Sequence, residues 1–194
     1  MIKATGWKKI IHQPGVWSTD HALSTMVYCP IFVTMILTKQ IAYNKLRRMA
    51  MEVAERNHDK KELLLIGIKE NGIVIAAIIA GMLKDIFPGN IQLLSLSLDK
   101  KDPGEITLSG NYDFNGANVL LIDDVANSGR TMLYALKPLL DKHPAMVQTL
   151  ALVERTHKLF PIAVDYVGYS VATETNQSIV VKVEGGEIAG AELV

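Results

Sequence analysis

The stretch "VLLIDDVANSGRTMLYAL", residues 119–136, decides the fold. Four apolar residues lead directly into two adjacent carboxylates, Asp123 and Asp124, and a small-residue turn, Ser128–Gly129, precedes a second apolar segment. The first part predicts a buried strand and the second predicts a helix. A strand, a polar turn and a helix in this order are typical of α/β proteins, in which ligands bind at the carboxyl ends of strands.

The turn after the two acids has the features of an anion site. Gly129 lets backbone N–H groups approach a ligand closely, Ser128 and Thr131 add hydroxyl groups, and the helix start adds a positive dipole end. Because carboxylates accept hydrogen bonds, the natural neighbour of Asp123 and Asp124 is a polyol, and a divalent metal would also serve. A phosphate beside a vicinal diol describes a ribose 5-phosphate.

Two other interpretations of this stretch are weaker. A pair of acids that only caps a helix would leave two like charges at a buried strand end without compensation. The turn is not a Walker A loop, since no Gly-Lys-Ser/Thr follows it, and it lacks the three spaced glycines of a dinucleotide-binding fingerprint.

The remainder of the chain alternates strands and helices. A helix with Thr38 as N-cap and Asn57 near its end would bury Ile41, Leu46, Met49 and Val53. Further helices are predicted over residues 72–87 and 129–140, strands over residues 63–67, 91–98, 117–123, 145–154, 164–168 and 178–183, and a long loop or hairpin over residues 99–116. Apolar strands that alternate with helices predict a parallel sheet covered on both faces.

Composition excludes several classes of protein. The 194 residues carry 20 basic and 20 acidic side chains, and residues 61–194 carry 11 Lys and Arg against 16 Asp and Glu. A broad nucleic-acid surface is normally basic, so this balance disfavours one. The single cysteine, Cys29, excludes an internal disulfide and fits a cytoplasmic protein. The uncharged residues 22–38 include Pro30 and barely reach bilayer length, so we expect no membrane span.

The stretch "VLLIDDVANSGRT" resembles the ribose-phosphate signature of the type I phosphoribosyltransferases, which bind phosphoribosyl pyrophosphate (PRPP). "LLLIGIKENGIVIA", residues 63–76, resembles the pyrophosphate loop of that family, and residues 151–174 resemble the strand that leads to its hood. These pieces are most similar to the branch of pyrimidine-operon attenuators with uracil phosphoribosyltransferase activity. The resemblance implies an α/β fold in which helices flank a parallel sheet and a small hood lies beside it.

The resemblance also implies roles for individual residues. Asp123, Asp124 and Lys69 would be catalytic, and Lys100 and Lys101 would belong to an active-site lid. Ser178, Ile179 and Val180 would bind the base, largely through backbone groups. Mg²⁺ would be held mainly by PRPP, without a metal site of the protein's own. The PRPP-binding residues would be Ile68, Lys69, Glu70, Asn71, Gly72, Asp123, Asp124, Ala126, Asn127, Ser128, Gly129, Arg130 and Thr131.

Four positions depart from the family's pattern. Asn127 stands where purine-using relatives carry a general base, and Glu154 stands where they place a lysine, so both favour a pyrimidine over hypoxanthine or guanine. Asn71 replaces an arginine that is usual in the attenuator branch, and Glu70 adds a negative charge. These two changes predict slow turnover, with PRPP binding retained.

Together these features predict an enzyme that transfers a phosphoribosyl group to a free base, with uracil favoured. A PRPP- or nucleotide-sensing regulator that binds RNA and has little turnover is the alternative, in which the face with Arg47, Arg48 and Arg56 would meet RNA. "RTHK", residues 155–158, could touch ligand or lie in solvent. We expect a homodimer with a dispensable extension over residues 1–34, a phosphoribosyltransferase domain over residues 35–183 and a tail over residues 184–194.

Overall fold

A computed structural model describes residues 34–99, 105–174 and 177–194. Residues 1–33 and the predicted lid lysines, Lys100 and Lys101, lie outside this part of the chain. Within it no helix combines the length and the apolar character needed to cross a bilayer.

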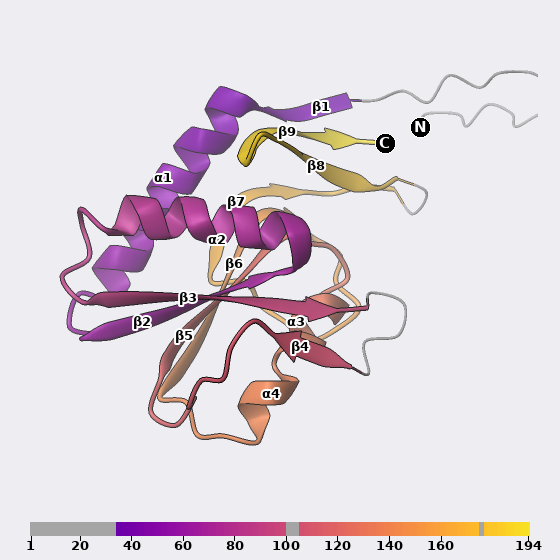
Figure 1. The fold of residues 1–194 in the computed structure, drawn as a ribbon. Helices are drawn as coiled ribbons and strands as arrows, with labels where there is room; N and C mark the ends of the chain where they lie inside the picture. Colours follow the sequence, from indigo (N-terminus) through magenta and orange to yellow (C-terminus); the bar gives the residue numbers. More distant parts are fainter. Residues whose placement is uncertain (1–33, 100–104, 175–176) are drawn as a thin grey trace, which may run out of the picture. The chain divides into compact units, whose positions relative to one another are not determined.

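Six strands form the central sheet, in the order β4-β3-β2-β5-β6-β7 (Figure 1). Five of them are parallel, as predicted, and β4 is an antiparallel edge strand that forms a hairpin with β3. The strands are β2 (Glu62–Ile68), β3 (Asn90–Leu98), β4 (Ile106–Leu108), β5 (Asn118–Ala126), β6 (Met146–Arg155) and β7 (Tyr166–Val171).

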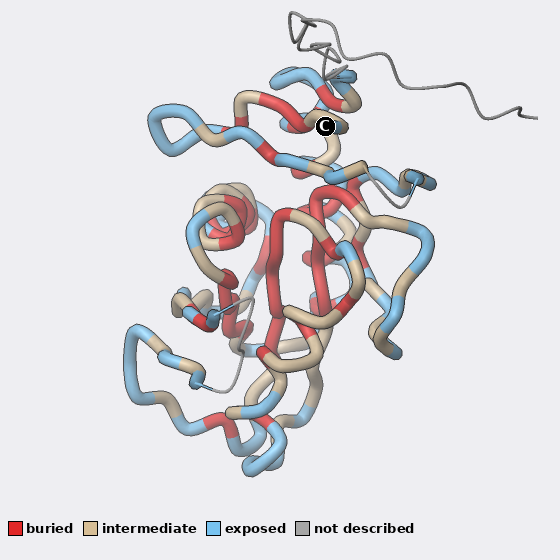
Figure 2. The backbone as a smooth tube through the Cα atoms, turned by 90° about the vertical axis from the view of Figure 1, so that its right-hand side faces the viewer, coloured by how far each residue is buried: buried red, intermediate tan, exposed pale blue. Residues whose placement is uncertain are grey.

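Helices cover both faces of this sheet. Helices α1 (Lys39–Arg56) and α2 (Lys69–Leu83) pack on one face, and the short helices α3 (Arg130–Ala135) and α4 (Lys137–Leu140) pack on the other. A hydrophobic core lies on each face of the sheet, and successive strand residues point alternately into one and the other. Leu120 and Ile122 of β5 face α1 and α2, whereas Val119 and Leu121 face α3 and α4. Figure 2 shows the buried residues concentrated along these central strands.

A second, antiparallel sheet of three strands forms the hood. Its order is β1-β9-β8, with β1 at Thr34–Thr38, β8 at Ile179–Glu184 and β9 at Glu187–Leu193. The sequence pattern predicts no helix or strand within residues 184–194, but β9 occupies the middle of the hood and pairs with both of its neighbours. Its short, glycine-containing pattern "EIAGAEL" lacks clear alternation, which explains why the strand is not apparent locally.

The first helix largely follows its predicted pattern. Thr38 is the N-cap, its Oγ1 accepts a hydrogen bond from Ile41 N at 3.3 Å, and Asn57 is the C-cap. Leu46, Met49 and Val53 are buried, but the prediction for Ile41 is wrong, because its side chain is 45% exposed and Ala42 is buried in its place.

The other two helices differ from their predicted bounds. The second begins at Lys69 and not at residue 72, so the expected pyrophosphate loop is the junction of β2 with the first turn of α2. The helix expected over residues 129–140 divides into α3 and α4 at Leu136. Pro138 explains this break, because it cannot donate the backbone hydrogen bond that a continuous helix requires.

Candidate functional site

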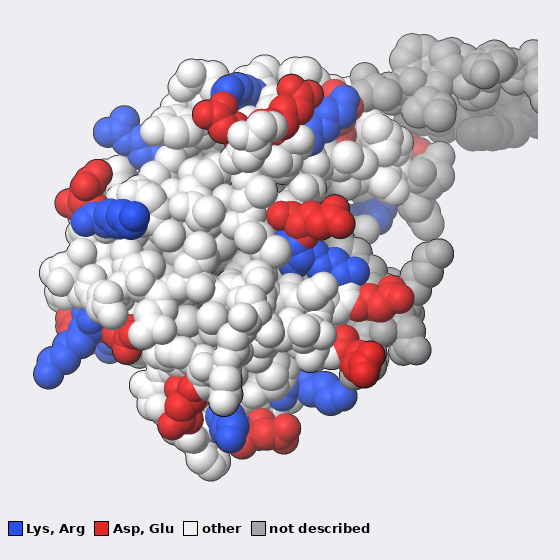
Figure 3. Space-filling view, in the orientation of Figure 1, with Lys and Arg blue, Asp and Glu red and all other residues white. Residues whose placement is uncertain are grey.

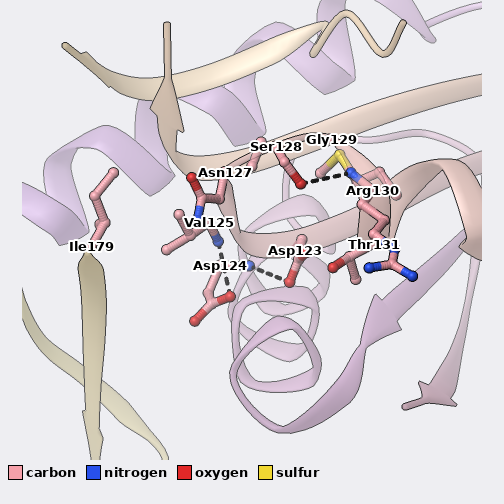
Figure 4. Close-up of a pocket in the computed structure, with 11 residues that line it drawn as sticks. Asp123, Asp124, Val125, Asn127, Ser128, Gly129, Arg130, Thr131 and Ile179 are labelled. Atoms are coloured by element: carbon pink, nitrogen blue, oxygen red, sulfur yellow. Dashed lines mark hydrogen bonds between the residues drawn. The ribbon is translucent and has the colours of Figure 1, made fainter. Parts of the chain in front are cut away.

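The two acids lie at the carboxyl end of β5, in the middle of the central sheet. Asp123 is 2% exposed and Asp124 is 8% exposed. In Figure 4 the carboxylates diverge, with that of Asp124 on the side of Ile179 and that of Asp123 on the side of Thr131. This divergence reduces the repulsion that two adjacent acids would otherwise have, since neighbouring strand residues project in different directions.

Each carboxylate accepts hydrogen bonds from the chain around it. The Asp124 backbone N–H donates to Asp123 Oδ1 at 2.9 Å, and the Val125 N–H donates to Asp124 Oδ1 at 2.9 Å. Asn71 Nδ2, from the first turn of α2, donates to Asp124 Oδ2 at 2.8 Å. The acids are therefore oriented acceptors whose remaining lone pairs can receive hydroxyl donors of a ligand.

A first cavity of about 330 Å³ lies beside the acids and the turn that follows them (Figure 4). Ser128 Oγ accepts from Arg130 N at 3.3 Å, and Gly129 has φ +83°, a left-handed conformation that favours glycine. The helix after this turn has only six residues, so its dipole contributes less than expected and the polar groups of the turn dominate. The lining residues are Asp123, Asp124, Val125, Ala126, Asn127, Ser128, Gly129, Arg130, Thr131, Met132 and Ile179.

A second cavity of about 250 Å³ shares the two acids. Its other walls come from the β2–α2 junction, in which Lys69 has φ +48°, a conformation that costs a non-glycine residue about 1–3 kcal/mol. Gly72 permits the close packing of α2 on β5 here, because a Cβ atom would lie 2.8 Å from the Ile122 carbonyl oxygen. The lining residues are Ile68, Lys69, Glu70, Asn71, Asp123 and Asp124.

The hood strand β8 reaches the first cavity through Ile179. Ser178 uses its backbone N–H and C=O on Val194, at 2.7 and 2.9 Å. In an antiparallel pair the backbone N–H and C=O groups of successive residues point alternately towards the partner strand and away from it. The backbone groups of Val180 therefore point towards β9, as those of Ser178 do, whereas those of Ile179 and Val181 point away from it. Of the three predicted base-binding residues, Ile179 therefore has the backbone groups that can reach a ligand.

Arg155, for which the sequence allows either a ligand contact or solvent exposure, links two parts of the site. Its Nη1 donates to Asn127 Oδ1 at 3.1 Å, and its Nη2 donates to the Glu174 carbonyl oxygen at 2.5 Å. Since a guanidinium only donates, the Asn127 oxygen must face Arg155 and the amide nitrogen must turn away from it. No short motif indicates this contact, because the two residues are 28 positions apart.

Glu154, which replaces a lysine of the purine-using relatives, does not carry an unpaired charge in the structure. It forms an ion pair with Lys158, and both side chains are 17% exposed. Ser170 Oγ also donates to Glu154 Oε2 at 3.2 Å. Repulsion between Glu154 and a purine oxygen is therefore reduced by the neighbouring cation.

The predicted cationic face of α1 is also partly engaged within the chain. Arg48 pairs with Glu52 at 2.5 Å and donates to the Val167 carbonyl oxygen, and the Arg56 guanidinium lies 4.9 Å from the centroid of the Tyr166 ring. This face therefore presents less available positive charge than the sequence indicates.

Most of this chain can be aligned with the sequences of known proteins. The phosphoribosyl transferase domain family matches residues 33–185. The bifunctional protein PyrR of Pelotomaculum thermopropionicum is 33% identical over 169 residues, which cover 82% of this chain and 92% of that protein. The bifunctional protein PyrR of Listeria welshimeri is 36% identical over 152 residues, which cover 71% and 82%.

Solved structures agree on the fold. The hypoxanthine phosphoribosyltransferase of Trypanosoma cruzi superposes with a TM-score of 0.69 at 16% identity, covering 81% of this chain and 95% of that one. A hypoxanthine-guanine phosphoribosyltransferase from Bacillus anthracis gives a TM-score of 0.61 at 18% identity, covering 76% and 85%. With the acid pair, the two cavities and the sequence matches, these likenesses show that the chain belongs to the phosphoribosyltransferases, a family of pentosyltransferases with the type I fold, in the branch of the bifunctional PyrR proteins.

Proposed function

We propose that the chain binds PRPP and transfers its 5-phosphoribosyl group to a free nucleobase, with release of pyrophosphate. The observation that carries this proposal is that two polar cavities share one buried acid pair. PRPP has the same three-part chemistry, with a phosphate at one end, a pyrophosphate at the other and a vicinal diol between them.

Each part of PRPP has a counterpart in the site. The 5-phosphate occupies the first cavity, where the turn from Ala126 to Thr131 supplies backbone N–H groups and hydroxyls. Asp123 and Asp124 accept hydrogen bonds from the ribose 2- and 3-hydroxyls. The pyrophosphate occupies the second cavity beside Lys69.

The reaction exchanges one bond at C1 of the ribose for another. The C1–O bond breaks with its electron pair remaining on pyrophosphate, a ring nitrogen of the base forms the new C1–N bond with inversion, and the proton of that nitrogen passes to solvent. Positive charge builds on the ribose ring and negative charge on the leaving group, so Lys69 contributes by stabilising the departing pyrophosphate.

Mg²⁺ fits this site as part of the substrate complex. Among the described residues no three His, Cys, Asp or Glu side chains come together, whereas Mg²⁺ requires about six oxygen ligands. Most of those oxygens would come from PRPP and water, with Asp123 and Asp124 nearby. The bound ion would neutralise phosphate charge.

The base would lie between the turn and the hood. Ile179 can offer one backbone N–H and one C=O, and the Asn127 amide nitrogen offers a donor because Arg155 holds its oxygen. Uracil presents a carbonyl, an N–H and a second carbonyl along one edge, which matches these groups. A purine nucleophile that needs a proton acceptor finds none at Asn127, so we favour uracil.

A screen of free bases with PRPP and Mg²⁺, with pyrophosphate release as the readout, tests this function. We expect release with uracil to exceed release with hypoxanthine or guanine. Faster conversion of hypoxanthine than uracil would overturn the base assignment. Tight PRPP binding without turnover of any base would favour the regulatory alternative.

That alternative, a PRPP- or nucleotide-responsive regulator that binds RNA, is supported by the likeness to proteins named bifunctional. The engaged arginines of α1 and the acidic balance of residues 61–194 oppose it. A gel-shift titration with structured RNA, with and without uridine monophosphate, tests it: a salt-sensitive, nucleotide-dependent shift would establish RNA binding.

We also propose a homo-oligomer that covers the outer face of α2. From Asn71 to Leu83 this helix carries no charged residue, and it is apolar around its whole circumference, which is typical of a buried helix. Figure 3 shows an uncharged area over α2 between its charged ends. Sedimentation of the wild type and of Ala77→Lys, a change at an exposed position of α2, tests this: we expect a dimer and a shift towards monomer, and a monomeric wild type would contradict it.

A further inference from the structure

Asn71 joins three elements that lie far apart in the sequence. Its single amide nitrogen donates to Asp124 Oδ2 of β5 at 2.8 Å and to the Val181 carbonyl oxygen of β8 at 3.1 Å. Asn71 itself belongs to the first turn of α2. Both protons of the amide are thereby used, one on the acid pair and one on the hood.

Each of these two hydrogen bonds is made to an acceptor of a buried residue. Val181 is 4% exposed, and its carbonyl points away from β9, so the pairing within the hood does not satisfy it. The bond to Asp124 is charge-assisted, which makes it shorter and stronger than a neutral hydrogen bond. A buried carbonyl that loses its donor is costly to the docked position of β8.

The geometry also limits which side chains can replace Asn71. The residue needs two donors on one planar group, because the two acceptors lie on different strands. Alanine provides no donor, and aspartate has the same shape but only acceptors. A carboxylate at this position would also face Asp124 directly, and two adjacent like charges disfavour ionisation of both.

We propose that Asn71 is a positioning residue that couples the docking of β8 to the orientation of the Asp124 carboxylate. The acid that receives the ribose diol and the strand that covers the base then assemble together. The identity of the ligand in this inference rests on the proposed function. The hydrogen bonds that link Asn71 to Asp124 and to β8 are a property of the unliganded chain.

Two variants and one matched control test the proposal in the full-length chain. Asn71→Ala removes the donors, and Asn71→Asp removes them and adds a charge. Asn118→Ala is the control, because Asn118 also donates its amide to a backbone carbonyl, that of Glu62 at 3.2 Å, but at the opposite end of β5.

The first measurement is hydrogen exchange by mass spectrometry without ligand. We expect Asn71→Ala to raise exchange in peptides that contain β8 while β2 and β5 stay protected, and we expect Asn118→Ala to leave β8 unchanged. Unchanged hydrogen exchange of β8 in Asn71→Ala would refute the proposed link between Asn71 and β8, whether or not the chain binds PRPP.

The second measurement is calorimetric titration with PRPP and Mg²⁺. Loss of one hydrogen bond to a charged group predicts an affinity about tenfold lower for Asn71→Ala, and a larger loss for Asn71→Asp. In mildly acidic buffer a shared proton should restore part of the affinity of Asn71→Asp but not of Asn71→Ala.

The outcomes separate the two proposals. Increased hydrogen exchange of β8 in Asn71→Ala, together with a wild-type chain that does not bind PRPP, would support the link between Asn71 and β8 and refute the proposed function. Increased exchange with full PRPP affinity in both Asn71 variants would show that the amide only holds the hood, and would overturn its role in positioning Asp124.

Discussion

The two cavities that share the acid pair are built in different ways. The first is formed mainly by one continuous stretch, residues 123–132, in which backbone groups and small side chains make the walls. The second is formed where β2 runs directly into α2, with a left-handed Lys69 and long polar side chains. Ligand contacts made by backbone groups survive most side-chain substitutions, whereas contacts made by side chains can be altered one residue at a time.

This difference matches where the chain departs from its family's pattern. The departures Glu70 and Asn71 lie in the second cavity, and Asn127 is the one departure in the turn of the first. We infer that recognition of ribose 5-phosphate is retained and that handling of the leaving group has changed.

The largest effect is expected at the shared acids. Asp124→Asn or Asp123→Asn should lower PRPP affinity by between about tenfold and about a hundredfold, because a charge-assisted hydrogen bond in a buried site is lost. Calorimetric titration with PRPP and Mg²⁺ measures this, and circular dichroism checks that the fold is intact. Unchanged affinity in both variants would remove the assignment of the diol to these acids.

The next effect separates the first cavity from the second. Gly129→Ala strains a backbone at φ +83° and places a Cβ atom 3.2 Å from the Phe160 carbonyl oxygen, so affinity for ribose 5-phosphate should fall about tenfold. Affinity for pyrophosphate should be unchanged. Gly116→Ala is the matched control, because Gly116 has φ +70° with no atom near its added Cβ. Equal losses in both variants would indicate a general effect on stability.

One substitution in the second cavity is expected to increase turnover. Asn71→Arg keeps donors for Asp124 and adds a cation near the pyrophosphate, whose charge grows as it leaves. Turnover with uracil should rise several-fold, because this interaction strengthens in the transition state. Steady-state kinetics with pyrophosphate release measures it, with Asn118→Arg as a control for added charge. A lower kcat would show that the shape of the amide matters more than the cation.

The smallest effect concerns the base. Arg155→Ala frees the Asn127 amide to rotate, so the KM for uracil should rise by about twofold to fivefold while PRPP affinity stays constant. Arg47→Ala, on the exposed face of α1, is the control. Loss of PRPP affinity in Arg155→Ala would instead place this residue in the support of the phosphate turn.

The same contrast explains what could be predicted from the sequence. The strand, the acids and the turn of the first cavity follow one another along the chain, so their pattern predicts both the fold and the position of the site. The contacts of Asn71 with Val181 and of Arg155 with Asn127 join residues 110 and 28 positions apart. Such contacts depend on how the hood packs on the sheet, and strand β9 likewise depends on its two neighbours rather than on local pattern.

The proposed function requires one PRPP molecule to bridge both cavities across the acid pair. Backbone amide spectra of isotopically labelled protein test it most directly with three ligands. Ribose 5-phosphate should shift the signals of Gly129, Arg130 and Thr131, pyrophosphate with Mg²⁺ should shift those of Lys69 and Gly72, and PRPP with Mg²⁺ should shift both sets at a single stoichiometric site. Shifts confined to one set in the PRPP titration would contradict the claim.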